Sequence, residues 1–537
     1  MKRILVALLC IAFISTAVFA QVAKTSPVAD VKVRQALAYA IDMKTIVNSL
    51  MSGKALVANS LTPNGAWKMP NMKTYTYNPQ KARDLLKAAN WDPNYTLDVV
   101  FYYGDQMTVD LMTAVQAYLA DVGVKMTFRK LEGDLASQLW VPPTDPVNGP
   151  AAVKWDLAYA AVAALSMNEY YDRFIPGGTA NSHTPTDPTL AKLIDATHVV
   201  DVAAQKKAFY ALQAYEGENL FALPLYYQQV FVVQNTKLDR AGSAFGNEQF
   251  NYDWNITKWT MPADASGKKV LKTNGGPVSF FETPFLNPGL FMSTKVLFDH
   301  LVVADASLTP SKGQLASDYK VSADGKLITF TLRKGIKWHD GSDITPEDVK
   351  WTYEFTAKVP TLNSVYGSML KALVGFQDFK DGKTDGIAGI TIKGSTVSFQ
   401  YTTADPNALL CFSQFPPLPK KYFADVDPMK FQQAAFWQKP VGSGPFMVKD
   451  VSMNNFATFV PFKQYWGGVA KLDEIQMYPS GESDPNFIKN ASASQLDYGY
   501  TKSVDDVLAA EKLSNLKVTP VDIRYTRLFF VNKFPKP

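Results

Sequence analysis

The residues best suited to acid–base chemistry stand together at His339-Asp340, directly before Gly341. A histidine beside a carboxylate can accept and return a proton, as in many hydrolases. An Asp-Gly pair is also typical of a tight turn, and Thr345-Pro346 predicts the start of a helix with Thr345 as its N-cap. The local pattern therefore fits either a catalytic pair or a structural turn.

Cysteine and metal chemistry find little support in the sequence. Cys411 lies in an apolar run, which is typical of a small core residue, and a nucleophile would need a nearby histidine. The four histidines are His183, His198, His300 and His339. No two of them have metal-ligand spacing, and we expect neither a metal nor another cofactor. Gly442-Ser443-Gly444 lacks the Lys-Ser/Thr pair that follows in a nucleotide-binding loop.

Composition limits the class of partner. Hydrophobic residues make up 47% and charged residues 19% of 537 residues, with a formal net charge of +5. These values are ordinary for a globular protein of more than one domain, and no basic run or aromatic-basic motif indicates nucleic acid. A glycan-acting hydrolase stays open as an alternative, because two carboxylates can meet in a fold without a sequence signature. The sequence singles out no such pair.

The first twenty residues are typical of an export signal. Met1-Lys2-Arg3 is the positive segment, residues 4–13 are apolar, and Val18-Phe19-Ala20 offers small residues before a cleavage site. Cys10 lies within the apolar segment rather than after it, so we do not expect a lipid anchor. No later stretch has 18 uninterrupted apolar residues. We therefore expect a protein exported to the periplasm.

The elements change character along the chain. Residues 30–227 alternate between helical and strand patterns, which predicts an α/β domain. Residues 262–269 are small, polar and turn-rich, as in a linker. Beyond them, Asp324-Gly325 and Gly394 lie between pairs of strand-like segments and predict hairpins.

Several of these segments together resemble one family. They are residues 332–341, 345–349, 441–446, 465–468 and 33–42. The set is similar to the oligopeptide/dipeptide/nickel-type solute-binding proteins of ABC importers, which are extracellular solute-binding proteins of family 5. The resemblance implies an α/β, two-lobed periplasmic-binding-protein fold of type II, cluster C, that closes on its ligand by a hinge. It also implies that His339-Asp340 is a structural turn.

The resembling segments stand in an unusual order, because the part that resembles the family's later half comes first. The end of the chain also reads into its mature start as the family's usual passage. We therefore expect a circular permutation. Its parts would be a signal peptide (1–20), one lobe (21–235), a crossover and linker (236–269) and a second lobe (270–537) with an extra subdomain at about 303–423. We expect one covalent crossing between the lobes, near residues 230–238.

The resemblance implies a receptor without enzymatic activity, a monomer that delivers a small solute to the permease subunits of an ABC transporter. A sensor that passes ligand occupancy to another protein would use the same closure. Peptide-binding members carry an Asp shortly after a strand like Trp155-Asp156-Leu157-Ala158, but the matching position here is near Leu165. Glu169 lies four residues on and could replace it after rearrangement of the loop.

We therefore expect an oligosaccharide in preference to a peptide, because sugars stack on aromatic rings and the chain is 13% aromatic. The expected ligand-binding residues are Trp67, Tyr102, Tyr103, Ser166, Asn168, Glu169, Tyr226, Tyr227, Phe285, Asn287, Trp437, Tyr500 and Tyr525. A peptide receptor of the same family is the alternative.

Overall fold

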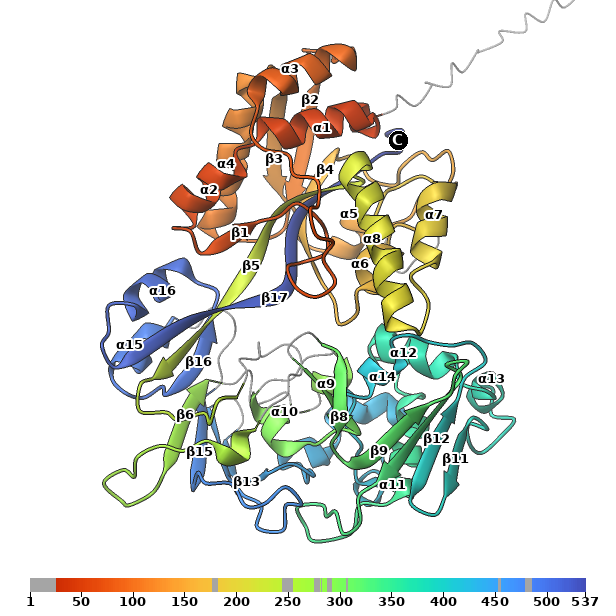
Figure 1. Ribbon diagram of the computed structural model, residues 1–537, viewed down its shortest axis with the longest axis vertical. Helices are drawn as coiled ribbons and strands as arrows, with labels where there is room; N and C mark the ends of the chain where they lie inside the picture. The colour runs from red at the N-terminus through yellow and green to blue at the C-terminus, as the bar shows by residue number, and fades with distance from the viewer. Residues whose placement is uncertain are drawn as a thin grey trace, which may run out of the picture.

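The computed structural model describes residues 26–175, 182–243, 255–274, 281, 283–286, 292–305, 308–452, 455–478 and 485–537. Two lobes lie one above the other and are joined by two long strands, β5 (Ala222–Asn235) and β17 (Leu516–Val531) (Figure 1). The expected α/β fold is confirmed. The expected signal peptide lies outside the described residues.

Lobe 1 contains the elements before β5. Its helices are α1 (Val31–Ala40), α2 (Met43–Leu50), α3 (Pro79–Ala88), α4 (Gln106–Asp121), α5 (Leu135–Leu139), α6 (Asn168–Asp172), α7 (Pro188–Asp195) and α8 (Val202–Asn219). Its strands are β1 (Ala55–Val57), β2 (Thr96–Phe101), β3 (Lys125–Lys130) and β4 (Leu157–Ala163). Asp30 and Asn78 cap α1 and α3 by accepting from backbone N–H groups of the first turn.

Lobe 2 contains the elements between β5 and β17. Its helices are α9 (Thr283–Leu286), α10 (Met292–Leu297), α11 (Pro346–Thr356), α12 (Ser364–Lys371), α13 (Phe376–Lys380), α14 (Ala408–Cys411), α15 (Phe487–Ser492) and α16 (Val504–Ala510). Its strands are β6 (Val270–Asn274), β7 (Val302–Ala304), β8 (Pro310–Gly313), β9 (Ala316–Val321), β10 (Leu327–Leu332), β11 (Ile390–Lys393), β12 (Thr396–Gln400), β13 (Phe446–Ser452), β14 (Phe456–Pro461), β15 (Glu474–Tyr478) and β16 (Tyr498–Thr501). Short 3-10 helices are η1 (Pro27–Ala29) in lobe 1 and η2 (Ile256–Lys258), η3 (Lys420–Tyr422), η4 (Pro428–Gln433) and η5 (Ala435–Gln438) in lobe 2.

One sheet continues through both lobes. Its order is β13-β14-β15-β6-β16-β5-β17-β4-β2-β3, with β1 added to β5. A separate four-stranded sheet, β11-β12-β10-β9, contains both predicted hairpins. Thr345 and Asp348 form a capping box at the predicted start of α11.

The expectation of a single covalent crossing is wrong. β17 is antiparallel to β5 from Leu516↔Asn235 in lobe 2 to Phe530↔Ala222 in lobe 1, so the chain returns to the lobe in which it began. Both crossings therefore belong to one hydrogen-bonded pair of strands, which is suited to act as a hinge.

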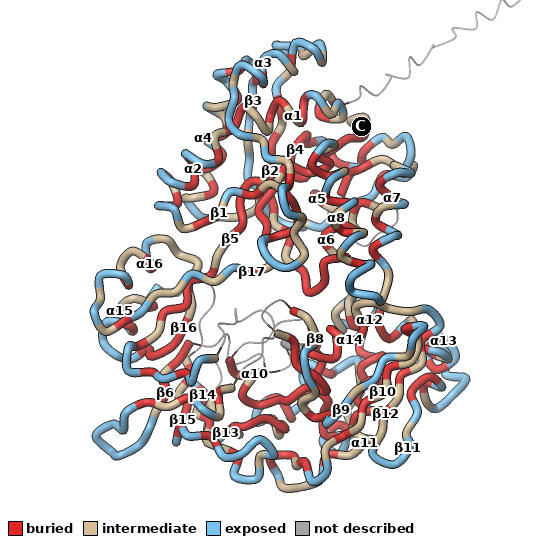
Figure 2. The backbone as a smooth tube through the Cα atoms, viewed as in Figure 1, coloured by how far each residue is buried: buried red, intermediate tan, exposed pale blue. Residues whose placement is uncertain are grey.

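Each lobe has its own core, visible as the buried segments inside each body in Figure 2. Two clusters fill lobe 1 on either side of its sheet, around Leu97 and Phe529 on one face and Trp155 and Phe530 on the other. A larger cluster fills lobe 2, includes Trp338 and reaches Leu165 of lobe 1. Because each core is centred in one lobe, the lobes can move as rigid bodies about the strands that join them.

The two motifs that suggested chemistry have structural roles. The Nδ1 atom of buried His339 accepts from the Gly442 N–H at 3.0 Å, and its Nε2–H donates to the Gly444 carbonyl at 3.0 Å. Asp340 accepts from the backbone of Ser342 at 2.9 Å and shapes the turn. A Cβ atom at Gly442 would lie 1.9 Å from the Leu297 carbonyl oxygen, so close backbone packing explains this glycine.

Candidate functional site

A cavity of about 500 Å³ lies between the lobes, and we call it the interlobe pocket. Its lining comprises Ser166, Glu169, Asp172, Arg173 and His198 from lobe 1, and Ser364, Val365, Ser368, Asp405, Asn407 and Cys411 from lobe 2. The lobe 1 wall follows the end of β4, where the chain turns into α6; the lobe 2 wall combines the start of α12 with residues at and before α14. A molecule bound here would contact both lobes.

Glu169 is the carboxylate nearest the end of β4. Its Oε1 atom accepts from the Ser166 N–H at 2.8 Å, which fixes the side chain against its own loop. Burial raises the pKa of Glu169, while the Ser166 hydrogen bonds and the positive charges of Arg173 and Arg524 oppose that rise. Glu169 therefore resembles a desolvated carboxylate that a cationic ligand group would stabilise.

A second group of charges spans the two lobes. His198 Nε2 lies 2.9 Å from Asp172 Oδ1, and this hydrogen bond raises the pKa of His198, with a smaller contribution from Asp405 of lobe 2. Burial raises the pKa of Asp405, and His198 opposes that rise across the pocket. Protonated His198 would thus attract both Asp172 in its own lobe and the Asp405 carboxylate in the other lobe.

The lobes already touch beside the pocket. Asn407 Nδ2 of lobe 2 donates to Asn168 Oδ1 of lobe 1 at 3.2 Å. Asn168 is 1% exposed and is fixed from within lobe 1, because its own Nδ2 donates to Thr197 Oγ1 at 2.8 Å. A second contact joins Gly325, in the β9–β10 turn of lobe 2, to Val200 of lobe 1. The two residues pack so closely that a Cβ atom at Gly325 would lie 2.5 Å from Val200 Cγ2. The structure therefore has the lobes in contact on the side away from the β5–β17 pair (Figure 1).

A smaller cavity of about 70 Å³ shares Ser166 and Asn407 with the interlobe pocket. Trp67 and Arg524 are among its lining residues. The Trp67 ring packs edge-on against Phe209, with ring centroids 5.6 Å apart. The structure thus brings together four of the expected ligand residues, Trp67, Ser166, Asn168 and Glu169.

Three other expected residues form an aromatic cluster beside the crossing strands. The Tyr102 and Tyr103 hydroxyls are 2.9 Å apart, and the Arg527 guanidinium lies 4.0 Å from the centre of the Tyr103 ring and 5.0 Å from that of Tyr525. Tyr500 is half-buried in β16 of lobe 2. None of the four lines the interlobe pocket or the smaller cavity beside it.

The remaining expected residues need correction or lie beyond description. Tyr226, Tyr227, Phe285 and Trp437 are at most 4% exposed and pack inside the lobes. The Tyr226 hydroxyl meets that of Tyr159 at 2.8 Å, and the Trp437 Nε1–H donates to the Phe431 carbonyl at 2.8 Å, so neither faces a solute. Asn287 lies outside the described residues.

Sequence reasoning missed most of the polar lining, including Asp172, Arg173, His198, Asp405 and Asn407. Asp405-Pro406-Asn407 reads only as a turn, more than 230 residues from Glu169 along the chain. The contact between the side chains of this turn and α6 is a tertiary contact, and no local sequence pattern predicts it.

The pocket is equipped for binding. Its lining offers carboxylates, cations and hydroxyls from both walls, while burial raises the pKa of the Cys411 thiol well above its usual range and keeps it protonated. Within the described ranges, no group of three or more His, Cys, Asp and Glu side chains is placed to hold a metal ion. Across the same ranges, no helix is long and apolar enough to cross a membrane.

Comparisons with known proteins agree on one family. The family described as "Bacterial extracellular solute-binding proteins, family 5 Middle" matches residues 13–188 and 311–537, more than half of the chain. The oligopeptide-binding protein OppA of Lactococcus lactis subsp. lactis is 32% identical over 190 residues, 33% of this chain and 31% of the relative. A putative ABC transporter peptide-binding protein of Brucella ovis is 26% identical over 217 residues, 40% of this chain and 38% of the relative. The chain thus spans about a third of the length of these curated relatives.

Solved structures give similar partial matches. Lactococcal OppA, complexed with an endogenous peptide in the closed conformation, is 26% identical with a TM-score of 0.37, covering 43% of this chain and 44% of that one. Haemophilus influenzae OppA in complex with the peptide RPPGFSPFR is 24% identical with a TM-score of 0.36, covering 43% and 45%. On the strength of the family match, this chain belongs to the bacterial extracellular solute-binding proteins of family 5.

Proposed function

We propose that the chain is the substrate-binding component of an ABC importer, working in the periplasm, and that it captures an oligopeptide in the interlobe pocket. The observation that carries the proposal is that Glu169 of lobe 1 and Asp405 of lobe 2 line one cavity. A ligand that contacts both walls stabilises the arrangement in which the lobes touch, because an open arrangement lacks half of those contacts. The names of the relatives, which are those of oligopeptide- and peptide-binding proteins, support the choice of ligand.

Glu169 is our candidate for holding the terminal ammonium group of the peptide. Neither Glu169 nor Asp405 forms an ion pair within 4 Å with another described residue, so both carboxylates are available to a cation. A charged hydrogen bond from an ammonium group in this desolvated site would be stronger than one in water.

The preference for an oligosaccharide finds no support among the relatives. Of the aromatic residues on which it rested, Phe285 and Trp437 pack in the core of lobe 2, and Trp67 lines only the smaller cavity. The described lining of the interlobe pocket contains no Trp, Tyr or Phe ring on which a sugar could stack, whereas a peptide would meet charges of both signs there. Oligosaccharides accordingly become the contrasting ligands in the test.

Isothermal titration of refolded protein with alanine tri- and pentapeptides, their N-acetylated forms, cellotriose and xylotriose tests the proposal. Free peptides should bind, and Glu169→Gln should weaken them at least about 30-fold, the usual effect of removing one partner of a buried charge pair. Glu132→Gln, at an exposed position of the same lobe, should change nothing. Binding of the oligosaccharides alone, or equal affinity of both variants, would contradict the proposal.

The rival reading as a hydrolase has its own measurement. Peptides and oligosaccharides incubated with the protein should be recovered intact by chromatography, because binding in the pocket breaks no bond of the ligand. Released products that vanish with Glu169→Gln would establish an enzyme instead.

We further propose that the halves stand in permuted order relative to the family, with lobes at about 21–235 and 270–537, an extra subdomain at about 303–423, and residues 262–269 joining the former ends. Supporting this, Ser26 and Lys536 contact the same residue, Asp156, so the two ends of the described chain lie together in lobe 1. A gene that opens the chain within 262–269 and links residue 537 to residue 26 should give a protein with unchanged peptide affinity. Failure of that protein to fold would count against the proposal.

A further inference from the structure

Lobe 1 contains a second cavity, of about 490 Å³, which shares no residue with the interlobe pocket. Its walls are formed by residues 38 and 41–44 around the junction of α1 and α2, residues 57–59 at the end of β1, segment 74–77, and residues 220 and 223–225 at the start of β5. We call it the lobe 1 pocket. Its size is that of a site for a small organic molecule.

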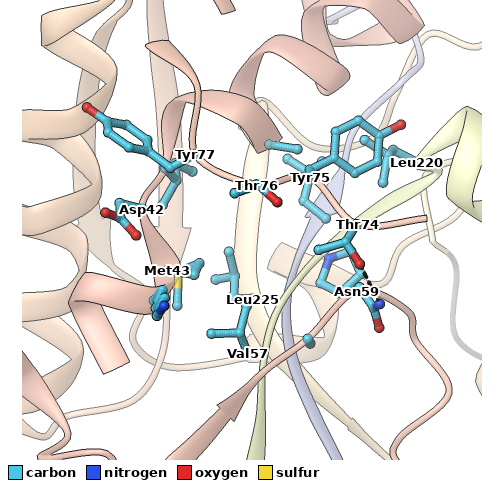
Figure 3. A pocket seen from close by; sticks show the side chains of 16 residues that line it. Asp42, Met43, Val57, Asn59, Thr74, Tyr75, Thr76, Tyr77, Leu220 and Leu225 are labelled. Atoms are coloured by element: carbon cyan, nitrogen blue, oxygen red, sulfur yellow. Dashed lines mark hydrogen bonds between the residues drawn. The ribbon is translucent and has the colours of Figure 1, made fainter. Parts of the chain in front are cut away.

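The floor of the lobe 1 pocket is apolar because of the alternation of side chains along β5. Leu223 and Leu225 are two residues apart and therefore project from the same face of the sheet. Met43 of α2 and Val57 of β1 complete this side, as Figure 3 shows. Leu223 and Leu225 are each 3% exposed, and segment 74–77, which forms neither helix nor strand, is another wall of the pocket.

Most polar side chains at the rim already form hydrogen bonds within the protein. Asp42 caps α2 and accepts from the Thr45 N–H at 3.0 Å and the Thr45 hydroxyl at 2.7 Å. Asn59 Nδ2 donates to Thr74 Oγ1 at 3.0 Å (Figure 3). The Tyr75 hydroxyl donates to the Gly217 carbonyl at 2.7 Å, away from the pocket. These groups have little capacity left for a ligand.

Lys44 is the one Lys or Arg among the described residues that line this pocket. It lines the pocket, its side chain is exposed, and it forms no ion pair, hydrogen bond or cation–π contact with any residue in the described part of the chain. An apolar floor with one available ammonium group at its edge is complementary to an apolar molecule with one anionic end.

We propose that the lobe 1 pocket binds a small amphiphilic carboxylate, whose alkyl chain lies against Leu223, Leu225 and Met43 and whose carboxylate pairs with Lys44. All of the pocket's walls belong to lobe 1, so occupancy does not require the lobes to close. Binding in the lobe 1 pocket is therefore independent of the proposed peptide function and can be tested separately.

The test is isothermal titration of the full chain with saturated carboxylates of six to twelve carbons, each below its critical micelle concentration. Affinity should rise about fourfold per added CH₂ until the pocket is full and then level off. Decylammonium should bind more weakly than decanoate, because its charge matches that of Lys44. Equal affinity for the two, or no dependence on chain length, would overturn the proposal.

Two matched pairs of variants locate the site. Ala38→Phe places a ring in the pocket and should abolish decanoate binding, whereas Ala117→Phe on the exposed face of α4 should not. Lys44→Gln should weaken decanoate about two- to fivefold, as expected for an exposed ion pair, and Lys87→Gln should have no effect. Peptide titration and thermal melting of each variant check that the fold is intact. Decanoate binding that survives Ala38→Phe in a folded protein would contradict the assignment.

Discussion

Lys536 forms an ion pair with Asp156, with 2.8 Å between Nζ and Oδ2, although the two residues lie 380 positions apart. The other carboxylate oxygen of Asp156 accepts from the Ser26 hydroxyl at 2.8 Å and the Tyr95 hydroxyl at 2.7 Å. The Asp156 side chain is fully buried, so one carboxylate ties both ends of the described chain to β4. This relationship explains how the strand that leaves lobe 2 is held in lobe 1.

Replacing Asp156 with Asn should destabilise the protein by about 3 kcal/mol, the usual cost of breaking a buried charged network by removing one partner. Urea unfolding followed by circular dichroism measures the change. Asp121→Asn removes a partner of the surface ion pair with Arg83 and should cost less than about 1 kcal/mol. Equal effects of the two substitutions would show that Asp156 does not anchor the chain ends.

His198 should make stability depend on pH. Its pKa is raised above the ordinary 6.5 by the hydrogen bond to Asp172, so the stabilisation is fully present below pH 6.5 and is lost as the pH rises through the folded-state pKa. The free energy of unfolding of wild type minus that of His198→Gln should therefore be larger at pH 6 than at pH 8. Urea titrations at the two pH values give this difference; a difference that stays constant or grows with pH would contradict the assignment.

Asn407→Ala should loosen the contact between the lobes, because it removes the hydrogen bond to Asn168. A neutral hydrogen bond contributes about 1 kcal/mol, so peptide dissociation should be about fivefold faster. Stopped-flow measurement of the dissociation rate tests this, with Asn94→Ala at an exposed position of lobe 1 as the control. An unchanged dissociation rate would mean that this contact does not hold the closed arrangement.

Local signals were sufficient for most of the elements. The Thr345 cap and the Asp324-Gly325 hairpin lie where the sequence predicts them, because capping and turn geometry depend on a few adjacent residues. β17 could not be predicted over its full length. Pro520 lies inside this strand, a position that sequence patterns disfavour, and the strand is held by pairing with β5.

The candidate site was predictable on one wall only. Ser166, Asn168 and Glu169 follow a strand that the sequence reveals, so the loop at its end is an identifiable place for ligand contacts. Aromatic residue type, in contrast, does not distinguish a ligand platform from core packing, and Phe285 and Trp437 proved to be core. Asp405 and His198 lie in different lobes, so their charges interact only because the two lobes are in contact.

A crystal structure of the protein with a bound peptide would show whether both lobes hold one oligopeptide in the interlobe pocket. Density for the peptide is expected between Glu169 and Asp405, with its ammonium group within hydrogen-bonding distance of Glu169. Peptide density elsewhere on the molecule, or a peptide that contacts one lobe alone, would contradict the proposed binding.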